Sequence, residues 1–452
     1  MRYRLVVIIM ISSGPACSHS KQDGQDLDRK WTGRLGRGSR KSCNVSQPGI
    51  ERGHEHSFRF HSPTGHRGGG MVKTPGYRTR TCALLLAFSG GAVACLMGAG
   101  SPTQPVESAT AGALAVPSRP SGDCADLLSG LTTRERVAQL IMAGADPGQE
   151  RATAGLVRDE HVGAIFIGGT STRLLTGGRL AAISAMAGIP LLTAVDEEGG
   201  RVQRIDDLDG ATPSARTLAA TGSPEHARAL GYSRGRQLLD RGVTMDLAPV
   251  ADVSDAPAKS VIGDRSFSVD PAVVTRYAGA FADGLRAAGV TPVLKHFPGH
   301  GNASGDSHRL LPRTPPLTVL ESRDLKPYEM LLPAGAPVVM MGHLDVPGLT
   351  GGLPASLSAA AYELLRGKYR FDGVAMTDDL GAMRAITDRF GLAEAATRAL
   401  VAGADLVLWS SPEPVSPVLD RLEHAVAAGE LPQSRLGEAL SRVVHLKTGC
   451  TP

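Results

Sequence analysis

The alternation of apolar runs along residues 139–408 is the feature that most constrains the fold. Eight short runs, each bounded by turn residues, are separated by Ala-, Leu- and Arg-rich stretches of helical character: Gln139–Ala143, Val162–Ile167, Pro190–Val195, Thr244–Val250, Thr291–Leu294, Pro337–Met341, Gly373–Met376 and Ala404–Leu408. Continuous apolar strands alternating with helices are typical of a parallel sheet covered on both faces. Eight such units predict an α/β fold, a single closed (β/α)8 barrel of TIM type without a second C-terminal domain.

An open, doubly wound sheet is the alternative architecture. It would carry a glycine-rich phosphate turn after its first strand, and Gly168-Gly169 after the second run is too little to provide one. Four helices between the runs also have visible limits: Arg179–Ala187, Pro224–Arg241, Pro271–Ala288 and Leu392–Ala402. Ser223 and Asp270 stand where N-caps are expected, and Gly403 stands where a helix commonly ends.

The chain has 452 residues, and only 123–452 are expected to form the barrel. Residues 1–17, with Arg2 and Arg4 before the apolar run Leu5–Ile11, resemble a targeting signal, whereas residues 18–70 are poor in apolar periodicity. Residues 1–70 are interpreted either as preceding the true start at Met71 or as a disordered extension. Residues 71–97 combine basic residues with an apolar run and predict a signal peptide. The end of that run, Ala92-Val93-Ala94-Cys95, resembles a bacterial lipoprotein processing site.

This reading predicts an exported protein of the cell envelope. Membrane contact would come only from a lipid on Cys95, and without it the protein would be secreted. Residues 98–122, rich in Pro, Ser, Thr and Ala, predict a linker. Of the six cysteines, Cys124 and Cys450 lie at the two ends of the predicted barrel, where a disulfide could join the termini.

Charged residues and histidines follow five of the predicted strands. The third run ends in Asp196-Glu197-Glu198, the fourth near Asp252, the fifth in Lys295-His296, the sixth in His343 and the seventh in Asp378-Asp379. In a (β/α)8 barrel the C-terminal ends of all strands meet at one face, and that face carries the active site. The sequence therefore predicts one polar site. The net charge of +4 owes much to the basic front segments and gives no case for nucleic-acid binding.

Two groups at this face suit acid–base and nucleophilic chemistry. Asp378 lies where a strand would hold it, as a nucleophile or electrostatic partner; the alternative for Asp378 or Asp379 is to cap a neighbouring backbone N–H. Asp306 and His308 are two residues apart, so in extended backbone they point to one side and the carboxylate could orient the imidazole. A solvated loop pair is the alternative. His296 and His300 have the spacing of helical zinc ligands, but Phe297-Pro298-Gly299 excludes that helix, so no metal is predicted.

The remaining polar groups suit a hydroxyl-rich ligand. Lys295, His296, Arg204 and Arg265 are donors and Asp196 is an acceptor, whereas Arg201 is interpreted as a structural ion pair. An anion beside a proton donor is what the oxocarbenium-like transition state of glycoside cleavage needs. The polar face is therefore interpreted as a sugar site.

These stretches carry a family resemblance: Val195–Arg204, Ile262–Phe267, Lys295–Gly301 with Asp306-Ser307-His308, and Thr377–Leu380. The chain resembles glycoside hydrolase family 3 in its β-N-acetylhexosaminidase branch, and the actinobacterial and mycobacterial lipoproteins within it. The likeness covers about Cys124–Lys447. One departure is Glu197, where Gln or His is frequent in the branch.

The resemblance implies a retaining exo-β-N-acetylglucosaminidase acting on terminal β-linked N-acetylglucosamine, from peptidoglycan fragments. It makes Asp378 the nucleophile and His308, paired with Asp306, the acid and base. Substrate binding falls to Asp196, Arg204, Arg265, Lys295 and His296. No cofactor is implied, and the partners are N-acetylglucosamine-containing glycans or muropeptides.

The proton-transfer segment carries further expectations. A histidine with a reference pKa of about 6.5 implies a near-neutral optimum. The segment Gly299–Gly305 is expected to be mobile, so that His308 can swing in. His300 is interpreted as structural, and Trp409 as core. Two functional alternatives stay open: a phosphorylase using the same site, and a lipoprotein that binds wall glycans without cleaving them. The sequence predicts no oligomeric state.

Overall fold

The computed structural model describes residues 123–451 apart from residue 147. The expected extension, signal and linker, at 1–70, 71–97 and 98–122, lie outside the described residues. Eight parallel strands close into a barrel in chain order: β1 (Ile141–Ala145), β2 (Ala164–Ile167), β3 (Leu192–Val195), β4 (Met245–Asp246), β5 (Thr291–Phe297), β6 (Val338–Met341), β7 (Val374–Asp379) and β8 (Leu406–Trp409). Pairing of β1 with β8, with Ile141 opposite Val407, completes the closure. The predicted (β/α)8 barrel is confirmed.

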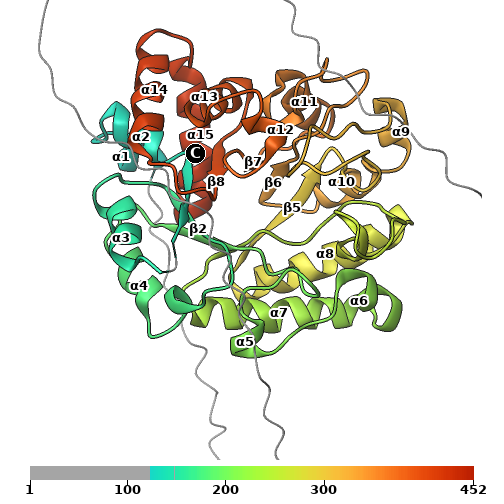
Figure 1. Cartoon of the computed structure of the whole chain (residues 1–452). Coiled ribbons are helices and arrows are strands. Elements are labelled where there is room, and N and C mark those ends of the chain that lie inside the picture. Colours follow the sequence, from blue (N-terminus) through green and yellow to red (C-terminus); the bar gives the residue numbers. More distant parts are fainter. Residues whose placement is uncertain (1–122, 147, 452) are drawn as a thin grey trace, which may run out of the picture. The chain divides into compact units, whose positions relative to one another are not determined.

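The helices surround the strands (Figure 1). They are α1 (Cys124–Leu128), α2 (Thr133–Ala138), α3 (Glu150–Arg158), α4 (Arg179–Ser184), α5 (Asp206–Asp209), α6 (Ala215–Thr221), α7 (Pro224–Asp240), α8 (Pro271–Ala288), α9 (Leu317–Ser322), α10 (Lys326–Leu331), α11 (Ala359–Glu363), α12 (Arg384–Thr387), α13 (Leu392–Ala402), α14 (Ser416–Ala427) and α15 (Gln433–Thr448). None of the helices in this part of the chain is long and apolar enough to span a membrane.

The predicted helix limits agree with the local chemistry. The Ser223 side chain accepts a hydrogen bond from the His226 N–H at the start of α7, and the Asp270 side chain accepts one from Ala272 at the start of α8. These bonds satisfy N–H groups that have no partner inside a helix. Gly403 ends α13 with a positive φ of 131°, a conformation that favours glycine.

Each of the eight strands overlaps its predicted run but has different limits, and the differences in β4, β5 and β7 bear on the site. β4 is short because Pro249 has no N–H to donate; the chain still runs beside β5, with the Ala251 N–H bonded to the Lys295 carbonyl. β5 extends past its apolar part to Phe297, whose carbonyl accepts from Gly342. β7 likewise extends to Asp379. Lys295, His296 and Asp378 therefore lie within strands rather than just beyond them.

A disulfide between Cys124 and Cys450 joins the two ends of the barrel, as the sequence suggested. Their Cα atoms are 5.1 Å apart and both residues are buried. A backbone hydrogen bond from Cys124 to the Thr451 carbonyl runs alongside. The bond closes a loop with a sequence separation of 326 residues, so nearly the whole barrel lies between its ends.

Removing this cross-link is expected to lower the free energy of unfolding. A disulfide restricts the unfolded chain, typically for a gain of about 2–4 kcal/mol. Guanidinium unfolding of the wild type with and without reductant, and of the Cys124→Ser/Cys450→Ser double variant, measures the effect. The double variant is the control and should not respond to reductant. An unfolding midpoint equal in wild type and double variant would contradict the prediction.

Candidate active site

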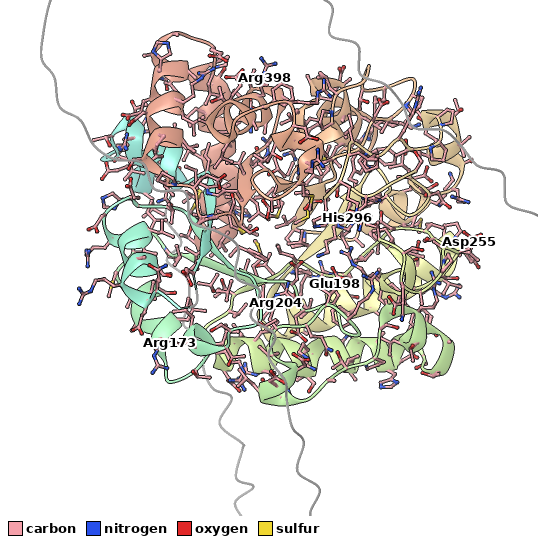
Figure 2. All side chains as sticks on the ribbon, viewed as in Figure 1. Arg173, Glu198, Arg204, Asp255, His296 and Arg398 are labelled. Atoms are coloured by element: carbon pink, nitrogen blue, oxygen red, sulfur yellow. A yellow bond between two sulfur atoms is a disulfide. The ribbon has the colours of Figure 1, made fainter. Side chains whose placement is uncertain are left out.

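One cavity of about 770 Å³ opens at the C-terminal ends of the barrel strands. Residues from widely separated parts of the chain line it. All eight predicted site residues are among them: Asp196, Arg204, Arg265, Lys295, His296, Asp306, His308 and Asp378. Glu198, Arg204 and His296 lie near the middle of the molecule, whereas Arg173, Asp255 and Arg398 lie at its edge (Figure 2). The structure therefore brings the predicted residues together in one site.

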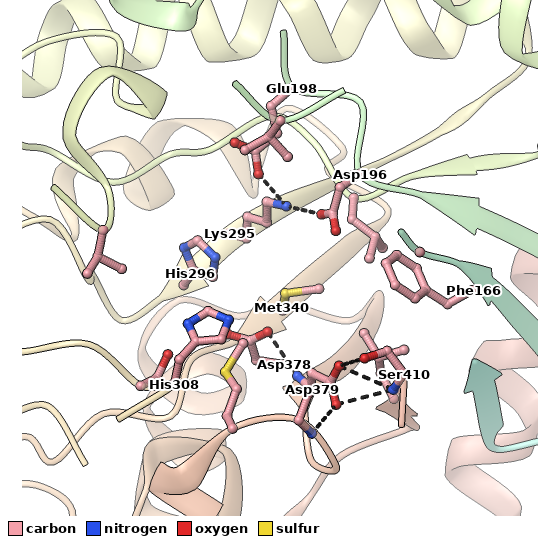
Figure 3. Close-up of a pocket in the computed structure, with 18 of the residues that line it drawn as sticks. Phe166, Asp196, Glu198, Lys295, His296, His308, Met340, Asp378, Asp379 and Ser410 are labelled. Atoms are coloured by element: carbon pink, nitrogen blue, oxygen red, sulfur yellow. Dashed lines mark hydrogen bonds and ion pairs between the residues drawn. The ribbon is translucent and has the colours of Figure 1, made fainter. Parts of the chain in front are cut away.

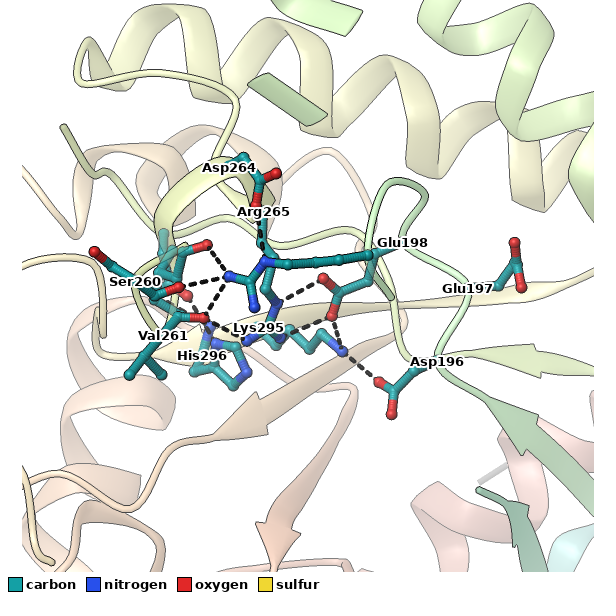
Figure 4. A network of polar contacts seen from close by, with 12 residues as sticks. Asp196, Glu197, Glu198, Ser260, Val261, Asp264, Arg265, Lys295 and His296 are labelled. Carbon is teal, nitrogen blue, oxygen red and sulfur yellow. Dashed lines mark hydrogen bonds and ion pairs between the residues drawn. The ribbon is translucent and has the colours of Figure 1, made fainter. Parts of the chain in front are cut away.

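Lys295 lies at the centre of an ionic network in this cavity (Figure 4). Its side chain is only 2% exposed, and its Nζ lies 2.6 Å from Asp196 Oδ1 and 2.7 Å from Glu198 Oε1. Arg265 binds the same Glu198 with two hydrogen bonds, of 2.7 and 2.8 Å. Burial alone would lower the pKa of Lys295, but Asp196 and Glu198 raise it above its usual value. Lys295 is therefore a fixed ammonium group.

Glu198 joins the two cations and was not among the predicted site residues. Burial would raise the pKa of Glu198, but Arg265 and Lys295 hold it below its ordinary value. The sequence placed Glu198 in the right acidic run, Asp196-Glu197-Glu198. Which acid of that run contacts Lys295 depends on how the chain turns after β3, and periodicity does not report this turn.

Glu197 points away from the network (Figure 4) and shapes the loop that carries Arg204. Its buried Oε2 accepts hydrogen bonds from the Arg204 and Ile205 N–H groups, at 2.6 and 3.1 Å. The Arg204 guanidinium lies 3.8 Å from Asp196 Oδ2. Its other oxygen, Oε1, lies 3.5 Å from the buried Arg234 Nε. The departure at Glu197 is thus accommodated behind the site, where its partners are two backbone N–H groups and a buried arginine.

Asp252 orients His296 from beneath. Its Oδ2 lies 2.7 Å from His296 Nδ1, and its Oδ1 accepts the His300 N–H at 2.7 Å. Burial would raise the pKa of Asp252, but His296 and His300 lower it. The ring of His300 is buried beside that of His296, with centroids 5.8 Å apart. Asp252 was identified from sequence only as a polar strand end.

The two adjacent aspartates of β7 have different surroundings (Figure 3). Asp379 accepts hydrogen bonds from the Gly381, Ala382 and Ser410 N–H groups, and the Ser410 hydroxyl also bonds to it. Asp378 accepts only one hydrogen bond from the described residues, from the Asp379 N–H to Oδ1 at 2.9 Å. The capping role foreseen for one of the pair thus falls to Asp379, and Asp378 keeps a free oxygen at the cavity.

The charge of Asp378 is stabilised from several sides. Burial would raise its pKa, but His343, His296, Lys295 and the Asp379 N–H outweigh burial and lower the pKa below its ordinary value. His343 is itself fixed by contacts of its ring with the Ser356 hydroxyl and the Asp379 carbonyl, at 2.7 and 2.9 Å. A buried, ionised carboxylate with an unbound oxygen is suited to nucleophilic attack.

Asp306 and His308 are paired as the i, i+2 spacing suggested, with His308 Nδ1 2.8 Å from Asp306 Oδ1. The His308 side chain is 61% exposed, about twice as much as that of Asp306, at 30%. Desolvation would raise the pKa of Asp306, but hydrogen bonds from His308 lower it. The dyad lies on the loop between β5 and α9, and both members line the cavity.

That loop is held at several points. Ser254 Oγ donates to the Gly301 carbonyl at 2.8 Å, and the Ser307 carbonyl accepts from the Ala385 N–H at 3.0 Å. Ser304 and Arg313 pair in an antiparallel bridge. The predicted mobility of Gly299–Gly305 stays a prediction.

Arg201 has the structural role expected of it. Its Nε lies 2.9 Å from Asp264, and its Nη2 donates to the carbonyls of Ser260, Val261 and Ile262. Within residues 123–451, residue 147 aside, no group of three or more His, Cys, Asp or Glu side chains has an arrangement that could hold a metal ion.

A parallel barrel with acids, cations and histidines gathered at the C-terminal ends of its strands is an arrangement found in many enzymes. The model of the glycosyl hydrolase family 3 N terminal domain matches residues 132–446, and the chain belongs to this family. It is a glycoside hydrolase.

Named relatives and solved structures agree. The chain is 49% identical over 381 residues to beta-hexosaminidase LpqI of Mycobacterium tuberculosis, covering 81% of this chain and 97% of LpqI. The crystal structure of a family 3 member from Mycobacterium smegmatis superposes with a TM-score of 0.69 at 52% identity, covering 71% of this chain and 98% of that one. A family 3 beta-N-acetylglucosaminidase from Paenibacillus has a TM-score of 0.67 at 34% identity, covering 70% and 62%. The predicted family and enzyme class are confirmed.

The variant Asp252→Asn tests the support beneath His296. The asparagine Oδ1 can still accept the His300 N–H, but its NH₂ group would face His296 Nδ1 and favour the other tautomer. Supporting hydrogen bonds of this kind typically change affinity or activity by about 10–100-fold, and we expect such a fall in kcat/KM. Steady-state kinetics and nitrogen NMR of the imidazole measure the two effects.

Asp270→Asn is the matched control, because asparagine caps a helix as well as aspartate and α8 begins away from the cavity. An Asp252→Asn protein with wild-type kinetics would show that the Asp252–His296 contact does not matter for the reaction.

Proposed function

We propose that the protein is a retaining exo-β-N-acetylglucosaminidase that removes terminal β-linked N-acetylglucosamine, from peptidoglycan fragments. The observation that carries the proposal is the pairing of two unlike groups on one cavity. Asp378 is buried, with a depressed pKa and a free oxygen, whereas His308 is exposed and paired with Asp306. The names of beta-hexosaminidase LpqI and of the Paenibacillus beta-N-acetylglucosaminidase support the choice of sugar.

In the first step Asp378 attacks the anomeric carbon with the oxygen that the Asp379 N–H leaves free. The bond to the glycosidic oxygen breaks, and His308 in its protonated form donates a proton from Nε2 to that oxygen. Asp306 holds Nδ1–H, which leaves Nε2 as the nitrogen that exchanges protons. The products are the released alcohol and a covalent glycosyl–Asp378 ester.

In the second step a water molecule attacks the same carbon. Neutral His308 takes the water proton at Nε2, the ester bond to Asp378 breaks, and the sugar leaves with its original anomeric configuration. The usual second carboxylate of a retaining enzyme is thereby replaced by the His308–Asp306 pair. Its exposed position gives it access to both the departing alcohol and the incoming water.

The fixed cations and acids bind the sugar. We assign substrate binding to Asp196, Lys295, Arg204, Arg265 and His296, which line the cavity around Asp378. The ion pairs hold each group in place before the sugar arrives, so little ordering is needed on binding. Asp196 contacts Lys295 through Oδ1. Its other oxygen, Oδ2, lies 3.8 Å from the Arg204 guanidinium and can still accept a hydrogen bond from a hydroxyl group of the sugar.

Hydrolysis is favoured over phosphorolysis by the same network. A phosphate that attacked the glycosyl ester would need a free cation among the groups assigned to the reacting sugar, and the cations of that network, Lys295, Arg265 and Arg204, all form ion pairs with carboxylates. The exposed Lys259 also lines the cavity but does not belong to this network. We therefore expect sugar release without sugar 1-phosphate when phosphate is added. We place the protein in the cell envelope, held by a lipid on Cys95, which lies outside the described residues.

Replacing Asp378 by Asn is expected to lower kcat by roughly 10⁴-fold or more, the scale seen when an essential catalytic carboxylate is lost. A fluorinated glycosyl donor forms the ester with Asp378, but the ester hydrolyses slowly. The wild type should therefore gain the mass of one sugar, and peptide mass spectrometry should locate this sugar on Asp378.

Asp240→Asn, at an exposed carboxylate on α7, is the control for a change of charge elsewhere. Label on another residue, or none with full turnover, would contradict the nucleophile assignment and direct attention to participation by the acetamido group.

Replacing His308 by Ala separates its two roles. With a nitrophenyl leaving group, which needs no proton, kcat/KM should stay within about 10-fold of the wild type, whereas with a disaccharide it should fall by about 10²–10⁴-fold. Azide, which attacks without a base, should restore kcat on the nitrophenyl substrate and give the β-glycosyl azide. Equal losses on both substrates, with no rescue by azide, would rule out the acid–base role.

A further inference from the structure

Lys259 differs from every other cation of the cavity. Five basic side chains line it besides the histidines, and four of them are bound to carboxylates: Arg201 to Asp264, Arg204 to Asp196, Arg265 to Glu198, and Lys295 to both Asp196 and Glu198. Lys259 is the fifth. It is exposed, and among the residues that the structure describes no carboxylate forms an ion pair with it. Its positive charge is therefore uncompensated at the cavity.

The segment that carries Lys259 is held by three arginines. Arg201 donates to the carbonyls of residues 260–262, and Arg216 donates to those of Ser254, Ala256 and Gly263. Arg265 adds a bond to the Val261 carbonyl at 3.2 Å. Two backbone bonds, Ser260 to Pro257 and Asp264 to Ala258, tighten the turn around Lys259 itself. The charge is thus presented from a fixed backbone, as binding groups usually are.

From its position, Lys259 would contact the leaving group and not the sugar that reacts. Asp378 and Lys295 are buried, so the reacting sugar must enter deeply to reach them. The aglycone then points from the anomeric carbon toward the exposed part of the cavity, where Lys259 lies. A cavity of about 770 Å³ is within the range that accommodates drug-sized ligands and is not filled by one sugar.

We propose that Lys259 selects substrates whose aglycone carries a carboxylate. A single ammonium group on a fixed turn pairs with a single carboxylate. The exposed Asp146, which follows β1 at the cavity, is not its partner, because it accepts hydrogen bonds from the Gly148 N–H and the Gln149 side chain. This inference rests on the proposed glycosidase function. In peptidoglycan fragments the carboxylate belongs either to the lactyl group of muramic acid or to the peptide attached to it.

Three substrates separate these possibilities: N-acetylglucosaminyl-β-1,4-N-acetylmuramic acid, the same disaccharide with its lactyl carboxylate converted to the amide, and the disaccharide bearing a lactyl-linked dipeptide with a free carboxylate. The variants are Lys259→Met, which keeps the apolar stem, and Lys259→Arg, which keeps the charge. Lys326→Met, on α10 and paired with Glu329, is the control for net charge.

We expect Lys259→Met to lower kcat/KM about 3- to 5-fold on a carboxylate-bearing substrate, the scale of an exposed ion pair. The amide should be unaffected, and Lys259→Arg should retain the wild-type preference. Raising the salt concentration to about 1 M, where the Debye length is about 3 Å, should remove the preference in the wild type. A loss on the muramic acid substrate alone would assign the lactyl group, and a loss on the dipeptide substrate alone would assign the peptide.

Equal effects of Lys259→Met on charged and neutral substrates, or an effect of the same size for Lys326→Met, would overturn the inference. Failure of the proposed function itself looks different: the wild type would cleave none of the three substrates.

Discussion

The site depends on one buried carboxylate between a buried lysine and a partly buried arginine. Glu198 binds Arg265 through two hydrogen bonds and Lys295 through one ion pair, and so joins the loop after β3, the 3₁₀ turn Gly263–Arg265 and strand β5. Taking a charged group out of water costs several kcal/mol, and attraction between the charges offsets this only when the geometry is good. Asp196 completes the balance, since it also contacts Lys295. The groups to which we assign sugar binding are consequently both charged and held in place by the same ion pairs.

Much of the fold could be predicted from the sequence because apolar periodicity reports burial directly. All eight strands follow from apolar runs, and Ser223, Asp270 and Gly403 mark helix limits as predicted. Helix α4 differs, because it ends at Ser184 and not at the predicted Ala187. The strand ends were the weak point. β5 and β7 continue into Lys295, His296 and Asp378, whose polar side chains end the apolar run although the backbone hydrogen bonds continue. β4 shows the opposite case, where the apolar run continues but Pro249 cannot take part in the ladder.

The same distinction explains which site residues could be foreseen. The type of residue that follows an apolar run can be identified from the chain alone, and all eight residues predicted from such positions and from motifs line one cavity. The supporting residues Glu198 and Asp252 are defined by their partners, 67 and 44 residues away along the chain, and no local pattern encodes such a pair. The division between Asp378 and Asp379 also depends on a distant residue, Ser410 of the segment after β8.

The proposed proton-transfer pair, Asp306 and His308, lies on a loop, whereas the proposed binding residues Lys295 and His296 lie in a strand. The glycines of the loop indicate where the chain could begin to move. A Cβ at Gly301 would lie 2.1 Å from the Val253 carbonyl oxygen, and one at Gly299 would lie 2.7 Å from the Asp324 Cβ. These two glycines therefore serve close packing, and the chain through Asn302 is held by its hydrogen bonds to Val253 and Asp324. Gly305, with a φ of 106°, is the first glycine after this packed part. Movement of Asp306 and His308 would accordingly start near Gly305, while Lys295 and His296, on the same segment of chain, stay fixed in β5.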